Sequence, residues 1–149
     1  MKTLLAAVDL SPISEKVIEG AGELALAMGA RLVLLNVWEP VAAYVPVGSA
    51  MDVITAPVLI EPPDLTVVKE RLERLADPLR KKGLLTETLA TAAMPVDEIL
   101  EQAKSLEASM IILGSHGHGA LFQLFSGSVV TSVLHKSSIP VTVIPVHGR

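Results

Sequence analysis

Short apolar runs alternate along the chain with segments of helical period, and this alternation limits the folds that are open to it. Most runs are apolar without interruption, which is typical of strands buried on both faces, while the run at 84–91 alternates with threonines. The predicted strands are residues 3–8, 31–38, 84–91, 110–113 and 141–146. Helices are predicted from Pro12 behind an N-cap at Ser11, from Asp64, from Pro95 and from Ser128. The order β-α-β-α-β-α-β-α-β predicts an α/β fold, an open, doubly wound, five-stranded parallel sheet with helices on both faces.

Composition favours one domain over residues 1–149. Half of the 149 residues are apolar, which is enough for a core, and the chain has no cysteine for a disulfide or a thiolate metal site. The apolar start ends at Asp9 without the pattern of a signal peptide, and no run approaches the ~20 apolar residues of a membrane span. We therefore expect a soluble, cytoplasmic protein with no membrane partner.

The charge pattern argues against nucleic-acid binding. The net charge is −4, and the basic residues are scattered rather than gathered on one face. Only one Trp, one Tyr and two Phe are available to stack on bases. We expect no nucleic-acid partner.

Residues 39–63 lack helical period and contain five prolines. We predict a long loop here, of the kind that serves as a lid or a mobile segment. Its apolar pieces, such as 44–47 and 58–60, indicate that it packs against a neighbouring molecule or a ligand.

Two strand ends carry unusual chemistry. Asp9 follows the first predicted strand, and Gly114 stops the fourth. In a doubly wound sheet, ligands bind beyond the carboxyl ends of the strands where the chain order reverses. If the first and fourth strands are neighbours, Asp9 and Gly114 meet in one crevice.

A glycine-rich turn follows the fourth strand, from Gly114 through Gly117 to Gly127 and Ser128. Glycines let the backbone approach a ligand closely, and a helix that begins at Ser128 directs free N–H groups and a positive dipole end to the same space. This arrangement suits a phosphate chain. It is not a P-loop, because no Gly-Lys-Ser/Thr follows.

The spacing Gly114-x2-Gly117-x9-Gly127-Ser128 resembles the nucleotide signature of the universal stress protein family. Three further landmarks agree: Val8-Asp9-Leu10-Ser11, Met94-Pro95 and the closing Ile139-Pro140-Val141-Thr142-Val143. The resemblance covers the chain from end to end. It implies the fold of the adenine nucleotide alpha hydrolase-like proteins and, because the glycines are kept, the branch of the family that binds ATP.

The resemblance also implies a set of contacts to ATP, or to ADP or AMP. Backbone of Ala7, Val8 and Val37 would line the base, Asp9 would contact the adenosine portion, and Leu113 and Gly114 would lie by the ribose. Gly117, Gly127, Ser128 and Val129 would hold the phosphates, with His116 facing them. Members of this kind are often homodimers joined through the last strand, here 141–146.

The turn departs from many family members because it has no Lys or Arg between Gly114 and His135. The phosphates would then depend on backbone N–H groups, on the helix dipole and on Mg²⁺. No carboxylate or arginine stands in the turn to support phosphoryl transfer, so we predict a binding protein with no catalytic residue and at most slow ATP hydrolysis.

Several alternatives stay open. One is an ATP hydrolase or phosphotransferase in which His116 or His118 acts. Another is a nucleotide-free dimerisation module whose 41–60 segment contacts a partner protein. In structural terms, Asp9 could cap the turn into the first helix, and Gly114 and Gly127 could be strand-end and helix-start glycines without a ligand.

Overall fold

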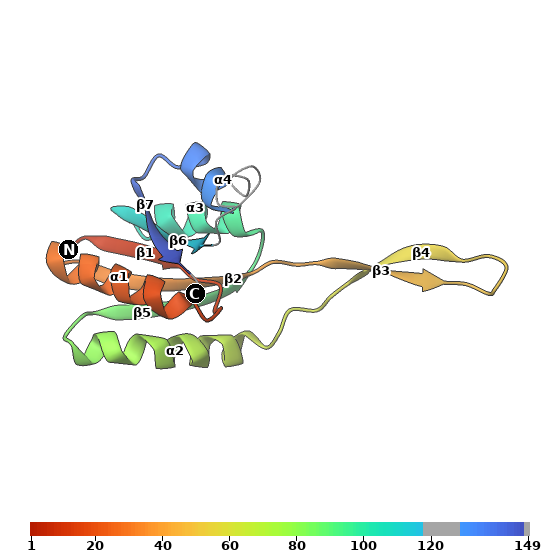
Figure 1. Ribbon diagram of the computed structural model, residues 1–149, viewed down its shortest axis with the longest axis horizontal. Coiled ribbons are helices and arrows are strands. Elements are labelled where there is room, and N and C mark those ends of the chain that lie inside the picture. Colours follow the sequence, from red (N-terminus) through yellow and green to blue (C-terminus); the bar gives the residue numbers. More distant parts are fainter. Residues whose placement is uncertain (118–128, 148–149) are drawn as a thin grey trace.

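The computed structural model describes residues 1–117 and 129–147 and confirms the predicted doubly wound α/β fold (Figure 1). All five strands of the main sheet are parallel, in the order β5-β2-β1-β6-β7. They are β1 (Thr3–Ala7), β2 (Arg31–Trp38), β5 (Thr86–Ala92), β6 (Met110–Gly117) and β7 (Val141–His147). The helices are α1 (Ser14–Met28), α2 (Leu65–Lys81), α3 (Pro95–Ser105) and α4 (Val129–Lys136).

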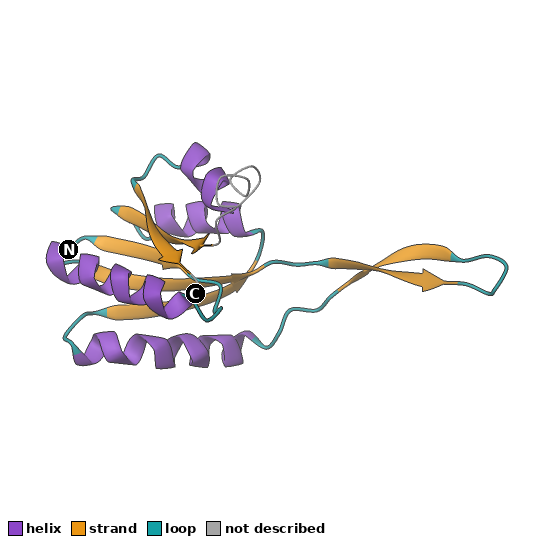
Figure 2. Cartoon of the chain, in the orientation of Figure 1, coloured by secondary structure: helices purple, strands orange, loops and turns teal. Residues whose placement is uncertain are grey.

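The helices cover both faces of the sheet, α1 and α2 on one and α3 and α4 on the other (Figures 1 and 2). Successive residues of a strand point to opposite faces, so each inner strand supplies two cores. In β1, Leu4 packs in the core beneath α1 and α2, while Leu5 packs in the core beneath α3 and α4. The continuous apolar runs follow from this double burial. In the described part of the chain, no helix is long and apolar enough to cross a membrane.

The predicted start of the first helix is wrong. The helix begins at Ser14, and its N-cap position is Ile13, which makes no side-chain cap hydrogen bond. The residues before it form a turn, in which Asp9 Oδ1 accepts a hydrogen bond from the N–H of Ser11 at 2.9 Å. Leu10 has φ +61°, in the left-handed region. The turn therefore uses Asp9, not Ser11, as its acceptor, and this delays the helix.

The fourth predicted strand does not stop at Gly114. β6 runs on to Gly117 because β7 continues beside it, with Gly114 opposite Ile144 and Gly117 opposite His147. The ladder to a neighbouring strand overrides the low strand propensity of glycine. The strand expected at 84–91 is displaced in the same way and runs from Thr86 to Ala92, because its ladder partner is β2.

The prediction of a loop over 39–63 is also wrong, because most of this segment is an antiparallel hairpin. Strands β3 (Ala42–Val47) and β4 (Ile54–Leu59) pair over their whole length. The connection begins at Gly48, where φ is +130° and an added Cβ would lie 2.0 Å from the carbonyl oxygen of Asp52. The hairpin projects away from the main sheet, beyond the carboxyl end of β2 (Figures 1 and 2). We call residues 42–59 the arm and the rest of the described chain the body.

A polar network fixes α2 to the edge strand β5. Arg80 on α2 forms an ion pair with Glu73 at 2.5 Å and donates from Nε to the carbonyl oxygen of Thr86 at 3.0 Å. The hydroxyl of Thr88 donates to the second oxygen of Glu73. Helix and strand are thus joined by charged hydrogen bonds as well as by the apolar stripe of α2.

This network predicts an acid-sensitive contribution to stability. The hydrogen bonds from Arg80 and then Thr88 lower the pKa of Glu73 below its usual 4.5. A lowered pKa in the folded state stabilises the fold above the unfolded value, and this stabilisation is lost as pH falls through the folded value. The side chains are 35% and 40% exposed, so we expect only about 0.2–1 kcal/mol.

Urea unfolding of the wild type and Glu73→Gln tests this expectation. The wild type should be the more stable at pH 7, and the difference should be smaller at about pH 3, which lies below the usual pKa of 4.5. Glu70→Gln, at an exposed position of the same helix, is the matched control. A difference that stays the same at both pH values would contradict the prediction.

Candidate functional site

A cavity of about 330 Å³ opens at the carboxyl ends of β1, β2 and β6. β1 and β6 are neighbours, with Ala6 opposite Ile112, and β2 lies on the other side of β1. The chain order reverses at this point of the sheet, which is where doubly wound folds bind their ligands. The volume falls in the range of about 300–1,000 Å³ that is typical of small-molecule sites. Asp9 and Gly114 both line this cavity, as expected if the two strands were neighbours.

The cavity wall is mostly aliphatic. The strand ends contribute a floor, and the first turns of three helices contribute the sides. From the strands and the residues that follow them, the lining consists of Ala7, Val8, Asp9, Leu35, Val37, Glu39, Leu113 and Gly114. From the helices and their entries, it consists of Ile13, Ser14, Val17, Pro95, Ile99, Val129 and Val130. Such a wall suits a flat apolar group.

Asp9 is held in place by the turn that it caps. Its Oδ1 accepts from the N–H of Ser11 at 2.9 Å and from the hydroxyl of the buried Ser14 at 3.1 Å. The residue is nevertheless exposed at the cavity. Asp9 therefore does cap the turn before α1, which was the alternative to a ligand contact. The two roles are compatible, because the hydrogen bonds of the cap orient the carboxylate at the cavity.

The backbone beside Asp9 is fixed from the neighbouring strand. The N–H of Val8 donates to the carbonyl oxygen of Leu35 at 2.9 Å, and the buried side-chain amide of Asn36 donates to the carbonyl oxygen of Val8 at 2.9 Å. Both polar backbone groups of Val8 are thereby used within the fold. This geometry holds the cavity floor rigid and leaves Val8 to contact a ligand through its apolar surface.

The charged groups at the cavity are both acidic. Asp9 and Glu39 are exposed at its rim, and the lining residues in the described part of the chain include no Lys or Arg. Carboxylates accept hydrogen bonds from hydroxyl and amino groups and repel phosphates. The cavity as described is therefore suited to the nucleoside end of a nucleotide. Among residues 1–117 and 129–147, no three His, Asp or Glu side chains gather as metal ligands would.

Gly114 is needed for packing as well as for access. An added Cβ at this position would lie 2.5 Å from Cγ2 of Val17, a buried residue on α1. The helix can lie this close to β6 only because Gly114 has no side chain. Close packing of α1 on β6 is therefore enough to explain a glycine at position 114, even without a ligand.

The structure brings together most of the residues predicted from the sequence. Ala7, Val8, Asp9, Val37, Leu113, Gly114 and Val129 line one cavity. His116 and Gly117 belong to the last part of β6, beyond Gly114. The predicted positions Gly127 and Ser128 lie outside the described residues, as does His118.

Sequence reasoning missed the helical walls. Ser14 and Val17 on α1, and Pro95 and Ile99 on α3, face the cavity without having been predicted. Helix starts that follow directly on strand ends are a signal for such positions, because the first turns of these helices flank the same edge of the sheet. Asn36 was missed because it lies within a run of apolar residues that was assigned to the core. A buried amide in such a strand is a signal in itself, because it indicates a nearby backbone carbonyl that needs a hydrogen-bond donor.

Comparison with known proteins gives a family for this architecture. Residues 1–145 match the sequence model of the universal stress protein family. Universal stress protein YxiE of Bacillus subtilis is 32% identical over 145 residues, which cover 95% of this chain and 97% of the relative. Universal stress protein A homolog 2 of Coxiella burnetii is 33% identical over 149 residues, with 99% and 97% covered.

Solved structures share the fold. A universal stress protein in complex with cAMP superposes with a TM-score of 0.70 at 20% identity, covering 97% of this chain and 96% of that one. A universal stress protein from Archaeoglobus fulgidus in complex with dAMP gives a TM-score of 0.65 at 23% identity, with 97% of each chain covered. Both of those proteins hold an adenine nucleotide.

Proposed function

The chain belongs to the universal stress protein family, and from this premise we propose that it binds an adenine nucleotide with the nucleoside in the β1–β6 cavity. The observation that carries the proposal is the cavity itself, an aliphatic slot at the switch point of the sheet with carboxylates at its rim. The slot fits a purine, and Asp9 and Glu39 are suited to accept hydrogen bonds from ribose hydroxyls or an exocyclic amino group. The cAMP and dAMP complexes of structural neighbours support the same ligand class.

The phosphates are proposed to extend from Gly114 towards Gly117, Gly127 and Ser128, with His116 beside them. Val129 at the first turn of α4 lines the cavity, so the positive end of this helix dipole is directed to the same region. ATP would bring Mg²⁺ on its own phosphates, which compensates for the absence of Lys and Arg from the turn.

We propose binding without efficient catalysis. Hydrolysis of ATP needs a cation or donor that stabilises the transferring phosphoryl group. The described cavity lining offers two carboxylates and no cation, which disfavours that chemistry. A cytoplasmic regulatory or stress-response role is the corresponding biological proposal, since such a protein would report on a nucleotide rather than consume it.

The last strand is the proposed site of homodimerisation. β7 is the outer strand of the main sheet, so one of its edges is not paired by any strand in residues 1–117 and 129–147. An edge of this kind is a template for pairing with a second β7 over residues 141–144, on the N-terminal side of Pro145, which lacks an N–H donor. The N–H of Ile111, which lies opposite Val141, donates to the carbonyl oxygen of Pro140, and in this parallel register the N–H of Val143 faces away from β6. Val143→Pro removes this outward donor, and we expect it to weaken the dimer in analytical ultracentrifugation.

Thermal melts with a series of ligands test the proposed nucleotide site. Adenosine, AMP, cAMP and ATP with Mg²⁺ should each raise the melting temperature of nucleotide-free protein, and GTP with Mg²⁺ should raise it less. At 100 times Kd, the added stability is about 2.7 kcal/mol, or roughly 5–11 °C for a chain of this size. No rise with any adenine ligand would favour the nucleotide-free partner-binding module.

The variant Gly127→Val tests the phosphate end separately. It should keep the response to adenosine and lose the additional response to ATP, because a side chain in the glycine turn blocks close approach of the phosphates. Equal responses to ATP in the variant and the wild type would exclude Gly127 from the site.

A further inference from the structure

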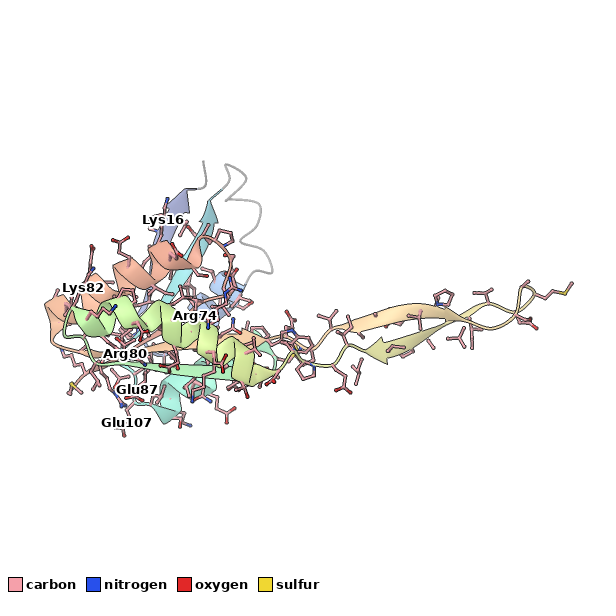
Figure 3. The ribbon with its side chains drawn as sticks, turned by 90° about the horizontal axis from the view of Figure 1, so that it is seen from below. Lys16, Arg74, Arg80, Lys82, Glu87 and Glu107 are labelled. Carbon is pink, nitrogen blue, oxygen red and sulfur yellow. The ribbon has the colours of Figure 1, made fainter. Side chains whose placement is uncertain are left out.

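The arm exposes apolar side chains that no other part of the described chain covers. The arm extends away from the body, and the side chains of β3 and β4 stand out on both sides of its ribbon (Figure 3). Val45 is 37% exposed, Val47 and Val58 are both 47% exposed, and Ile54 is 67% exposed. From residue 41 to residue 60, the sequence contains a single charged residue, Asp52.

Such a surface is unfavourable in an isolated chain. A two-stranded hairpin is marginally stable by itself in water, and large exposed apolar patches mark interaction sites. The arm makes no contribution to the two cores of the body, whose buried residues all lie outside 42–59. Its apolar residues therefore receive no stabilisation from either core.

The register of the hairpin separates two different faces. Residues opposite each other in an antiparallel pair share a face, and successive residues alternate. One face, which we call the aliphatic face, consists of Ala43, Val45, Val47, Ile54, Ala56 and Val58. The opposite face consists of Ala42, Tyr44, Pro46, Thr55, Pro57 and Leu59. Only the second face carries hydroxyl groups and prolines.

The prolines also disfavour strand addition as the mode of contact. Pro46 in β3 and Pro57 in β4 each lack an N–H donor, and proline in an edge strand opposes pairing with another strand. The arm is therefore expected to bind through the side chains of one of its faces and not through its backbone edges.

We propose a second contact between copies of this chain, separate from the β7 edge: the aliphatic face of the arm docks on the body of a second copy, and the second copy returns the contact. The area supports a reciprocal clasp. Two six-residue strands are about 20 Å long and about 10 Å wide, so one face offers roughly 300 Å² of accessible surface with its side chains. Two arms packed only on each other would bury roughly 600 Å², below the ~1,200 Å² of a stable interface, whereas two arms on two bodies reach that value.

A second copy is favoured over other occupants by the chemistry of the face. An aliphatic surface without charge is typical of permanent homo-oligomers, while transient interfaces are more polar. A two-fold dimer doubles every contact, and copies of the chain are always present together. A lipid surface is disfavoured because the arm has no Lys or Arg to bind anionic headgroups.

Two adjacent substitutions give a matched test. Val58→Glu places a charge on the aliphatic face, and Leu59→Glu places the same charge on the opposite face. Simple exposure predicts the larger effect at Leu59, which is 75% exposed against 47% for Val58. The proposal predicts the reverse: Val58→Glu raises the dimer dissociation constant at least roughly tenfold, and Leu59→Glu changes it less than about threefold.

Sedimentation equilibrium of the full-length proteins measures these constants, with thermal melts to verify that each variant is folded. A wild type that stays monomeric at ~100 µM, equal effects of the two variants, or a larger effect of Leu59→Glu would each overturn the proposal. Cosedimentation of the wild type with phosphatidylserine vesicles, lost in Val58→Glu, would assign the face to a lipid and overturn it as well.

Photocrosslinking locates the contact. The chain has no cysteine, so Val45→Cys accepts a single benzophenone label. In a mixture of ¹⁵N-labelled and unlabelled chains, we expect mixed-isotope crosslinks from the arm of one copy to the body of the other. Crosslinks only within one chain, or only from arm to arm, would overturn the reciprocal clasp.

Discussion

Ala7→Leu is expected to abolish stabilisation by adenine nucleotides while leaving the protein folded. Ala7 ends β1, is half-buried and lines the cavity, so a leucine there grows into the space proposed for the nucleoside. If Kd rises 100-fold, a ligand concentration that stabilises the wild type by about 2.7 kcal/mol adds only about 0.4 kcal/mol to the variant. Thermal melts of both proteins with AMP and with ATP measure this directly.

Ala92→Leu is the matched control for this experiment. It makes the same change at the exposed end of the edge strand β5, at a residue that does not line the cavity. The control should respond to nucleotide like the wild type. An unchanged response in Ala7→Leu would place the nucleotide outside the β1–β6 cavity and would contradict the proposed function.

Gly114→Ala is expected to destabilise the protein even without a ligand. Its Cβ would lie 2.5 Å from Cγ2 of Val17, and a β-branched side chain on a packed helix has little freedom to move aside. Overpacking of this kind costs about 1–3 kcal/mol, which corresponds to a fall of roughly 2–12 °C in melting temperature.

A double-mutant cycle with Val17→Ala identifies the cause. Removing Cγ2 of Val17 makes room for the new methyl group, so the double variant should be less destabilised than the sum of the single changes, by at least ~0.5 kcal/mol. Additive effects would show that the new methyl group is accommodated without a clash against Val17. The cycle separates the packing role of Gly114 from any contact with a ribose, which nucleotide titration of the double variant then measures.

The sheet could be predicted because burial on both faces leaves an unmistakable pattern. Leu4-Leu5-Ala6 in β1 and Leu32-Val33-Leu34-Leu35 in β2 contribute to two cores at once, and their short length distinguishes them from a buried helix. The arm could not be predicted by the same argument, since it packs on neither core. Its only signal in the sequence is local: a glycine turn at Gly48 between two segments that contain β-branched residues. The prolines in those segments favoured the prediction of a loop instead.

The candidate site also contains residues that the sequence predicts and residues that it does not. Asp9 and Gly114 were found because the carboxyl ends of adjacent parallel strands meet, which follows from the element order alone. Ser14 and Ile99 depend on which residue begins each helix and which face of the sheet that helix covers. Those two facts are set by tertiary packing, such as the turn that delays α1 to Ser14, and a linear pattern does not contain them.

The central place of β1 in the sheet has a consequence for how the chain acquires its structure during synthesis. β1 pairs with β2, some 28 residues further along, but its other edge waits for β6, more than 100 residues away, with Leu5 opposite Ile111. Until residue 112 has left the ribosome, the nascent chain holds part of a sheet in which one edge of β1 is unpaired and the apolar side chains of Leu4, Leu5 and Ala6 are incompletely covered. Distant pairings of this kind slow folding and expose intermediates to aggregation. Nascent chains that end between β5 and β6 should therefore be the species that depend most on chaperones.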